Sequence, residues 1–288
     1  MKLIIGGSGY IGRNLFEYFL GKNEPVTATY HNSKRENMIY FDLENPKLDN
    51  LGIDFKKIDS AFICSAITHP DECKRNEKSS YELNVRSTRN IIKQLWQFNI
   101  LPVWFSSEYV FNGEKGNYKE SDEKNPNTVY GHHKKAIEDF LCNSKKDFLI
   151  VRLSKVFGLE AEDRTLLTSI VKQLKNHEEI RCATDQIFSP TYIKDLSRVL
   201  DLAIEKRLRG IYNIASSEYF SRYRIAKMIK SQLRIKSGKI IPCSIKNFNF
   251  LDSRPLNTSL NVEKIIQATG FKFTPIRESI SLLEKMIR

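Results

Sequence analysis

The stretch MKLIIGGSGYIG, residues 1–12, places a short apolar run directly before three glycines with the spacing G-x-x-G-x-x-G. The run predicts a buried strand, and the glycines at its end predict a tight turn. Gly6 lets the chain turn, Gly9 lets backbone N–H groups approach a pyrophosphate, and Gly12 lets the next helix pack closely on the strand. The start of that helix then faces the anion. The stretch therefore predicts a dinucleotide-binding turn.

The residues beside the glycines are typical of a strand-turn-helix unit. Lys2 to Ile5 form the apolar run, and Tyr10 to Leu20 form a helical pattern with Ile11 on its apolar face. Tyr10 and Ile11 begin this helix, so we place them with the three glycines in the predicted cofactor site.

The composition is that of a globular protein with a large core. The 288 residues suffice for one large α/β domain with a smaller lobe. Hydrophobic residues make up 41%, no apolar run has the length of a membrane span, and the first residues lack the apolar region of a signal peptide. We expect a cytoplasmic protein without membrane association. The five cysteines are scattered, so free thiols are expected.

The formal charge of +12 favours substrates that carry several phosphates. Lys and Arg are spread along the chain without a basic arm, so nucleic-acid binding is not expected.

His132 and His133 would point about 100° apart on a helix and cannot bind one metal ion together, so no metal site is expected. The hydrolase and NTPase motifs G-x-S-x-G, H-E-x-x-H and the Walker turn do not occur.

Apolar runs and helical patterns alternate along the first half of the chain. The alternation predicts a Rossmann-type α/β fold, which is a doubly wound parallel sheet with right-handed crossovers. The predicted strands are 2–5, 26–30, 38–41, 60–66, 101–106 and 148–153, and the clearest covering helices are 81–98 and 129–141.

After residue 155 the strand candidates become shorter, which predicts a second lobe. We expect a nucleotide-binding Rossmann domain formed by 1–155 with 190–216. A smaller C-terminal α/β substrate lobe is then formed by 156–189 and 217–288.

Two segments carry residues that can catalyse proton transfer. SSEYVFNG (106–113) follows a predicted strand and supplies Ser107, and VYGHHKK (129–135) opens a predicted helix and supplies Tyr130 and Lys134. Positions four apart share a helix face, so the Lys134 ammonium is expected near the Tyr130 phenol. At a dielectric constant of about 20 and a separation of about 6 Å, the attraction is about 3 kcal/mol and lowers a phenol pKa by about two units.

The spacing Tyr-x-x-x-Lys occurs four times, so its context has to select the pair. Only the pair at 130 and 134 follows a strand that ends in hydroxyl residues and lies close enough in the sheet order to reach a nicotinamide. The other pairs are Tyr18/Lys22, Tyr30/Lys34 and Tyr223/Lys227.

Together these residues resemble the extended short-chain dehydrogenase/reductase superfamily. The resemblance rests on the glycine turn, Asp42-Leu43, Asn84, Ser107, and Tyr130 with Lys134. Within the superfamily, five further segments are similar to the dTDP-4-dehydrorhamnose reductase (RmlD-like) family. They are SSEYVFNG, VRLSKVFG (151–158), TDQIFSPTYIKDL (184–196), GIYNIASSEYFSRYRIA (210–226) and RPLNTSL (254–260).

The resemblance implies hydride transfer from NADPH to the keto carbon of a nucleotide-diphospho-4-keto-6-deoxy sugar, in cell-surface polysaccharide synthesis. Tyr130 would donate the proton, Lys134 would lower its pKa and bind the nicotinamide ribose, and Ser107 would orient the carbonyl oxygen. The family commonly has a Thr at Ser107 and an Asp at Glu108. Glu108 is a candidate catalytic residue whose longer side chain leaves its role open.

The same resemblance implies a set of substrate contacts. Ser107, Glu108, Val110 and Phe111 would bind the sugar. Arg254 matches the family arginine that meets the sugar nucleotide, and its planar guanidinium suits a diphosphate.

The segment after the second predicted strand bears on the cofactor. NAD-binding folds commonly place an acidic residue there to hold the ribose 2′-OH. The segment TATYHNSKRE has no carboxylate from Thr27 to Arg35, and Lys34 and Arg35 can accept a 2′-phosphate, so NADPH is expected. The other predicted cofactor contacts are Asp42 and Leu43 at the adenine, Ser65 and Ala66 on the pyrophosphate side, and Tyr130 and Lys134.

Two alternative functions stay open. One is a non-catalytic regulatory subunit like that of methionine adenosyltransferase, against which the intact Ser107, Tyr130 and Lys134 argue. The other is a sugar-nucleotide epimerase or dehydratase that keeps its NAD, against which Lys34 and Arg35 argue. The sequence leaves the oligomeric state undecided, a homodimer included.

Overall fold

A computed structural model describes residues 1–287, and the chain folds into two compact units. The first unit comprises Met1–Val110, Thr128–Arg152 and Arg207–Tyr212, and the second comprises Phe111–Asn127, Leu153–Lys206 and the chain from Asn213 onward. The predicted boundaries placed all of 190–216 with the first domain. In the structure only 207–212 of that segment belong to the first unit, and 111–127 and 153–155, which were also predicted for the first domain, belong to the second unit.

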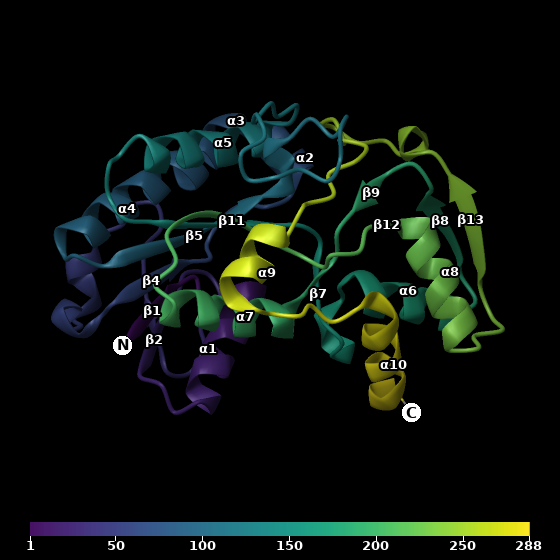
Figure 1. Ribbon diagram of the computed structural model, residues 1–288, viewed down its shortest axis with the longest axis horizontal. Helices are drawn as coiled ribbons and strands as arrows, with labels where there is room; N and C mark the ends of the chain where they lie inside the picture. Colours follow the sequence, from purple (N-terminus) through teal and green to yellow (C-terminus); the bar gives the residue numbers. More distant parts are fainter. Residues whose placement is uncertain (288) are drawn as a thin grey trace. The chain divides into compact units, whose positions relative to one another are not determined.

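The first unit is built on a seven-stranded sheet with the order β3-β2-β1-β4-β5-β6-β11, in which β3, β2, β1, β4 and β5 pair in parallel (Figure 1). On either side of β1, Lys2 lies opposite Val26 and opposite Ser60. The strand order reverses between β1 and β4, where doubly wound sheets bind nucleotides. The predicted Rossmann-type fold is confirmed. The strands are β1 (Lys2–Ile5), β2 (Val26–Tyr30), β3 (Met38–Tyr40), β4 (Ser60–Ile63), β5 (Leu101–Ser107), β6 (Leu149–Leu153) and β11 (Gly210–Ile214).

Helices cover this sheet on both sides. Figure 1 shows α4 and α5 together above the sheet and α1 below it. Leu95 on α4 and Ile137 on α5 are fully buried in the same hydrophobic cluster as Leu3 and Ile5 of β1. The helices of this unit are α1 (Tyr10–Gly21), α2 (Pro70–Arg75), α3 (Glu77–Tyr81), α4 (Thr88–Gln97) and α5 (Val129–Cys142), with 3-10 turns at Leu48–Leu51, Phe55–Lys57 and Glu108–Val110.

The helix predicted over 81–98 is not uniform. Between α3 and α4 the chain forms a π-helical turn at Glu82–Ser87. Asn84 lies in this turn and binds the backbone of Ile67 twice, since its Nδ2 donates to the carbonyl at 2.9 Å and its Oδ1 accepts from the N–H at 2.8 Å. The side chain thus anchors the loop after β4 to the helix.

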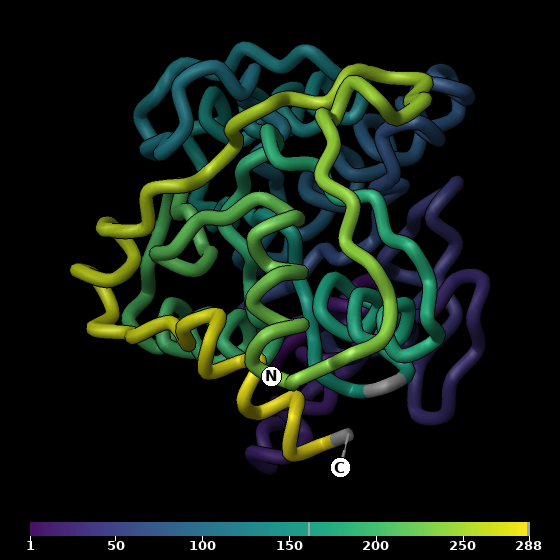
Figure 2. Tube along the Cα trace, turned by 90° about the vertical axis from the view of Figure 1, so that its right-hand side faces the viewer, coloured from purple at the N-terminus to yellow at the C-terminus, as the bar shows by residue number. Residues whose placement is uncertain are grey.

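The second unit combines short strand pairs with helices. In Figure 2, β13 runs beside α8, with which it is in contact. Its strand pairs are β7 (Val156–Phe157) with β10 (Thr191–Tyr192), β9 (Ile187–Phe188) with β12 (Phe220–Ser221), and β8 (Glu179–Ala183) with β13 (Lys239–Cys243). Its helices are α6 (Leu166–Lys175), α7 (Ile193–Glu205), α8 (Arg222–Gln232), α9 (Glu263–Thr269) and α10 (Ile276–Ile287), with 3-10 turns at Ala161–Asp163 and Ile245–Asn247.

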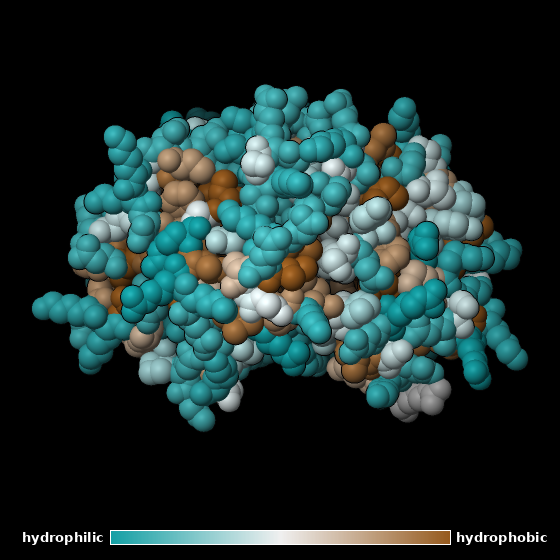
Figure 3. Space-filling model, in the orientation of Figure 1, coloured by the Kyte–Doolittle hydropathy of each residue, from teal (hydrophilic) through white to brown (hydrophobic). Residues whose placement is uncertain are grey.

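The surface drawn in Figure 3 is mostly hydrophilic, with apolar side chains in separate small patches. Within residues 1–287, none of the helices combines the length and the apolar character that crossing a membrane requires. The five cysteines are free thiols.

Candidate active site

The three glycines of the opening turn meet different constraints. Gly6 has a φ of +85°, and a Cβ there would lie 2.8 Å from the backbone nitrogen of Ser65. A Cβ on Gly12 would lie 2.3 Å from the carbonyl oxygen of Gly6. A Cβ on Gly9 would meet only that oxygen, at 3.4 Å, which is an ordinary contact. Packing within the protein therefore requires glycine at 6 and 12, whereas Gly9 is left free for the close approach of a ligand.

The turn is held by a residue that the sequence analysis did not single out. The N–H of Gly6 donates to Thr29 Oγ1 at 3.1 Å, and the N–H of Gly7 donates to the carbonyl oxygen of Thr29 at 2.7 Å. Gly9 caps α1 without a side chain, and the first turn of the helix carries no acidic residue. The start of α1 is therefore suited to an anion. Tyr10 and Ile11 lie half-buried at this start.

The predicted adenine contacts lie beyond β3. Leu43 is buried, and Asp42 is half-buried and accepts a hydrogen bond from the N–H of Glu44 at 2.9 Å. Lys34 and Arg35 are exposed in the segment between β2 and β3. Within residues 27–35 no carboxylate competes with them for a phosphate.

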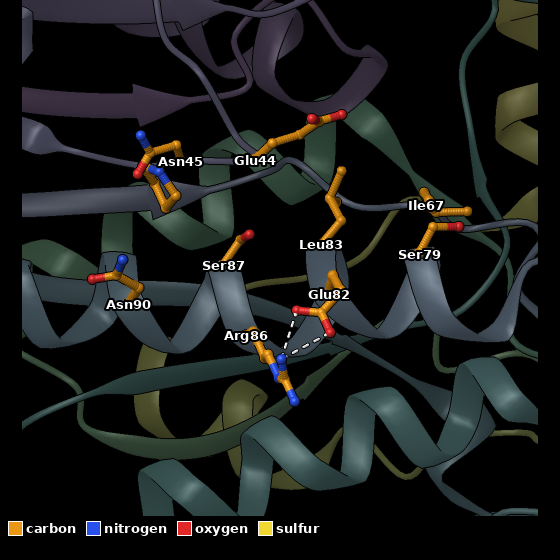
Figure 4. Close-up of a pocket in the computed structure, with 10 residues that line it drawn as sticks. Glu44, Asn45, Ile67, Ser79, Glu82, Leu83, Arg86, Ser87 and Asn90 are labelled. Atoms are coloured by element: carbon orange, nitrogen blue, oxygen red, sulfur yellow. Dashed lines mark hydrogen bonds and ion pairs between the residues drawn. The ribbon is translucent and has the colours of Figure 1, made fainter.

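A cavity of about 470 Å³ lies next to this region in the first unit (Figure 4). Glu44 and Asn45 line one side of it, and Leu83 and Ser87 line the side formed by the π-helical turn and α4. Glu82 and Arg86 pair with each other at 2.9 Å and point away from Glu44 and Asn45 in this view. The other lining residues are Pro46, Ile67, Ser79 and Asn90.

The sequence analysis named Asp42, Leu43 and Ala66 but not the walls of this cavity. Ile67 and Leu83 are apolar residues in a loop and in a helix, and no sequence motif distinguishes them from core residues. The two hydrogen bonds from the Asn84 side chain hold the backbone of Ile67 beside the cavity.

The predicted catalytic residues come together in the first unit. Ser107 ends β5, Tyr130 and Lys134 lie on the buried face of α5, and each is less than a tenth exposed. The Ser107 hydroxyl is hydrogen-bonded to the Tyr130 phenol, and it donates to Glu108 Oε2 at 2.8 Å. Glu108 is also buried, so its carboxylate is shielded from solvent.

The direction of the pKa shift of Tyr130 differs from the prediction. Burial, followed by the Glu108 carboxylate, raises the pKa of the phenol, while the hydrogen bond with Ser107 acts in the opposite direction. The Lys134 ammonium donates to the carbonyl oxygen of Phe105 at 2.7 Å and lies 5.5 Å from the centre of the Tyr130 ring. The predicted lowering of the phenol pKa is therefore wrong for this arrangement, because desolvation raises the pKa.

Burial also acts on Lys134. It lowers the pKa of the ammonium to about 8, and Cys73, Glu138 and Cys64 counteract it. The ammonium lies 4.6 Å from the centre of the Trp104 ring. With this pKa, Lys134 is mostly charged at neutral pH, and it loses its proton as the pH rises through about 8.

Val110 and Phe111 are fully buried, so their side chains pack within the protein. Phe111 stacks on Tyr118 with ring centres 4.1 Å apart. Arg254 belongs to the second unit, where its guanidinium lies 4.2 Å from the centre of the Phe250 ring. It donates to the carbonyl oxygens of the two preceding residues, at 3.1 Å each.

The second unit contains a cationic cavity of about 270 Å³ that the sequence analysis missed. Lys155, Arg164 and Arg222 line it, together with Thr165 and Ser169 at the start of α6. The remaining lining residues are Val156, Leu166, Gln186 and Phe188, so none of the nine is acidic. The cavity is suited to a phosphate group, but its three cations are too far apart in the sequence to form a motif.

The glycine turn at the reversal of the strand order, with a buried Ser107, Tyr130 and Lys134 in the same unit, defines the class as a short-chain dehydrogenase/reductase. The family model of the RmlD substrate binding domain matches residues 1–287. The chain belongs to this family.

Curated relatives cover most of the chain. It is 27% identical to the dTDP-4-dehydrorhamnose reductase of Aggregatibacter actinomycetemcomitans, over 94% of this chain and 93% of that one. It is 28% identical to the spore coat polysaccharide biosynthesis protein SpsK of Bacillus subtilis, over 75% of each. It is also 24% identical to the methionine adenosyltransferase 2 subunit beta of Danio rerio, over 96% of this chain and 89% of that one.

Solved structures have the same fold. A dTDP-4-dehydrorhamnose reductase from Clostridium acetobutylicum has a TM-score of 0.84 at 28% identity and covers 100% of this chain and 98% of its own. The enzyme of that name from Bacillus anthracis, solved with NADP, has a TM-score of 0.84 at 23% identity and covers 98% of this chain and 97% of its own.

Proposed function

We propose that the protein is an NADPH-dependent oxidoreductase that reduces the 4-keto group of a nucleotide-diphospho-4-keto-6-deoxy sugar. The observation that carries this proposal is the buried group of Ser107, Tyr130 and Lys134 in the unit that holds the glycine turn. The names of the relatives support a nucleotide-sugar substrate and a role in cell-surface polysaccharide synthesis. We expect the protein to work in the cytoplasm.

The residues present fit NADPH. Glycine at position 9 is not required by packing, which suits a backbone that contacts a pyrophosphate. The start of α1 would hold that group, and Lys34 and Arg35 would hold the 2′-phosphate. Asp42 and Leu43 would flank the adenine beside the 470 Å³ cavity. When bound, NADPH supplies the hydride.

The chain's own residues provide the proton and the orientation. Because its pKa is raised, the Tyr130 phenol keeps its proton at neutral pH and can give it to the ketone oxygen as a general acid. Ser107 would orient that oxygen, and Glu108 would hold the Ser107 hydroxyl in place. The charged Lys134 would bind the nicotinamide ribose and stabilise the phenolate that remains after proton transfer.

The second unit offers residues that would bind a phosphate group. The cavity lined by Lys155, Arg164 and Arg222 offers three cations and the start of a helix. Arg254 offers a further guanidinium for the sugar nucleotide.

The test is the reductase reaction itself. The purified protein is mixed with NADPH and a panel of nucleotide-linked 4-keto-6-deoxy sugars, and the absorbance at about 340 nm is followed. We expect loss of NADPH with at least one sugar and formation of the corresponding alcohol. The absence of turnover across the panel would contradict the proposal. Product formation with tightly held NAD⁺ and no net use of NADPH would favour an epimerase or dehydratase.

A second candidate is a non-catalytic regulatory subunit, which the similarity to the methionine adenosyltransferase subunit supports. This candidate predicts a stoichiometric complex with a methionine adenosyltransferase catalytic subunit, measured by size-exclusion chromatography with light scattering. It also predicts no reductase turnover. The same experiment on the isolated chain would detect a homodimer.

A further inference from the structure

A fully buried ion pair lies beside the catalytic residues. Arg152 on β6 donates to Glu138 on α5 through two nitrogens, with Nε 2.9 Å from Oε1 and Nη2 2.7 Å from Oε2. Ser106 on β5 donates to the same Oε1 at 2.6 Å. Glu138 and Arg152 are both 0% exposed. The three side chains connect α5, β5 and β6 inside the first unit.

This pair is connected to the catalytic group in two ways. Tyr130, Lys134 and Glu138 are spaced by four residues, so they share one face of α5. Ser106, which binds Glu138, directly precedes Ser107 on β5 and follows Phe105, whose carbonyl oxygen accepts from Lys134. A change at Glu138 therefore acts on Lys134 along α5 and on Ser107 along β5.

Stability alone does not explain why the pair is there. Removing two charges from water is expensive, and well-packed apolar side chains of similar volume commonly serve as well or better. A buried pair at this place thus calls for another role. The role available is electrostatic, because Lys134 is itself a buried cation that needs a nearby negative charge.

Among the groups that oppose the desolvation of Lys134, Glu138 is the carboxylate that accepts two hydrogen bonds from Arg152. The other two are thiols, and burial raises the pKa of Cys73 to about 11 and that of Cys64 further. The groups around Lys134 come from four elements: Tyr130, His133 and Glu138 on its own helix, Cys73 on α2, Cys64 after β4, and Trp104 with the carbonyl of Phe105 on β5. Two further charged groups interact with these neighbours. Arg152 on β6 pairs with Glu138, and Glu108 interacts with Tyr130.

We propose that Glu138, held in place by Arg152 and Ser106, is a positioning residue of the reductase that keeps Lys134 protonated and so sets the alkaline limit of activity. This inference rests on the proposed function for its kinetic readout. Glu138 touches neither substrate nor cofactor in this account, since it acts through Lys134.

The decisive variant replaces both partners and combines Glu138→Leu with Arg152→Met. A protein with an apolar pair at these positions can fold, whereas a single unpaired buried charge can prevent folding. We expect the alkaline limb of kcat/KM to move to lower pH by about half a unit or more, since activity that needs charged Lys134 is lost earlier. In Glu138→Gln the charge of Arg152 remains, so the shift is expected to be larger. Asp139→Asn is the matched control, because Asp139 pairs with Lys135 on the outer part of the same helix.

If activity falls by the same factor at every pH and the alkaline limb of kcat/KM stays in place, the Glu138–Arg152 pair has only a structural role. That result would overturn the proposal. An equal shift in Asp139→Asn would also overturn it. The pH dependence of NADPH affinity, followed by fluorescence, gives a second readout that needs no substrate. If the wild type binds NADPH but reduces no sugar, the proposed function fails. The pH at which NADPH affinity falls in the Glu138 variants then still tests whether Glu138 keeps Lys134 protonated.

Discussion

At the scale of single residues, one residue type performs three different tasks in the opening turn. Gly6 is required by its positive φ, and Gly12 by the 2.3 Å approach of a Cβ to the backbone. Gly9 is required by neither. The G-x-x-G-x-x-G spacing predicted all three positions, but only the structure separates the glycines that serve the fold from the one assigned to the ligand.

This separation predicts different effects for two similar substitutions. Gly12→Ala forces backbone to move and should cost about 1–3 kcal/mol, which lowers Tm by several degrees. Gly9→Ala should change stability by about 0.5 kcal/mol or less and weaken NADPH binding about tenfold. Thermal unfolding and NADPH titration measure the two effects. Equal loss of stability in both variants would contradict this assignment.

We propose that two exposed residues, Lys34 and Arg35, decide the cofactor preference. Replacing Lys34 and Arg35 with Ala should raise the KM for NADPH about tenfold or more, because charge-assisted hydrogen bonds to the 2′-phosphate are lost. The KM for NADH should stay nearly unchanged. Lys93→Ala, an exposed lysine on α4, is the control for general loss of positive charge. A parallel rise for both cofactors would count against these two residues.

At the scale of elements, α5 shows how neighbouring residues acquire different properties. His132 is exposed and His133 is buried, where its Nδ1 lies 3.4 Å from Asn84 Nδ2. Burial, and then the charge of Lys134, lowers the pKa of His133 to about 4. The predicted divergence of the two side chains on the helix is confirmed.

The buried histidine predicts a pH-dependent stability. An unfolded histidine takes up a proton near its ordinary pKa of about 6.5, whereas His133 in the folded state does so near 4, so the unfolded state binds more protons between these values. Stability is therefore lost as the pH falls from 6.5 towards 4, by about 2 kcal/mol at pH 5. Urea unfolding at pH 7.5 and pH 5 should show a smaller loss in His133→Gln and the full loss in His132→Gln. Equal losses in both would contradict the account.

The sequence predicted β5 and α5 because their apolar periods and hydroxyl residues are local signals. It did not predict the π-helical turn at Glu82–Ser87, because that turn depends on the contact between Asn84 and Ile67, 17 residues apart. It also had the wrong sign for the pKa of Tyr130. The spacing gives the distance to Lys134, but desolvation depends on tertiary burial, which one helix does not reveal.

At the scale of the whole molecule, the family match spans both units, yet the fold alone does not determine the function. Relatives over nearly the whole chain include a dTDP-4-dehydrorhamnose reductase and a methionine adenosyltransferase 2 subunit beta. The distinction has to come from the chemistry of the site. The first unit holds the glycine turn and the proposed catalytic group, and the second holds the cationic cavity of Lys155, Arg164 and Arg222. That cavity escaped prediction because distant segments assemble it.

The most direct test is steady-state reduction by Tyr130→Phe, with the best sugar of the panel and saturating NADPH. The substitution removes one hydroxyl group from a buried ring, so the fold should be nearly unchanged, and saturating NADPH offsets any loss of cofactor affinity. The account predicts that kcat falls by about 10²- to 10⁴-fold. Wild-type kcat in this variant would contradict the claim that the Tyr130 phenol delivers the proton.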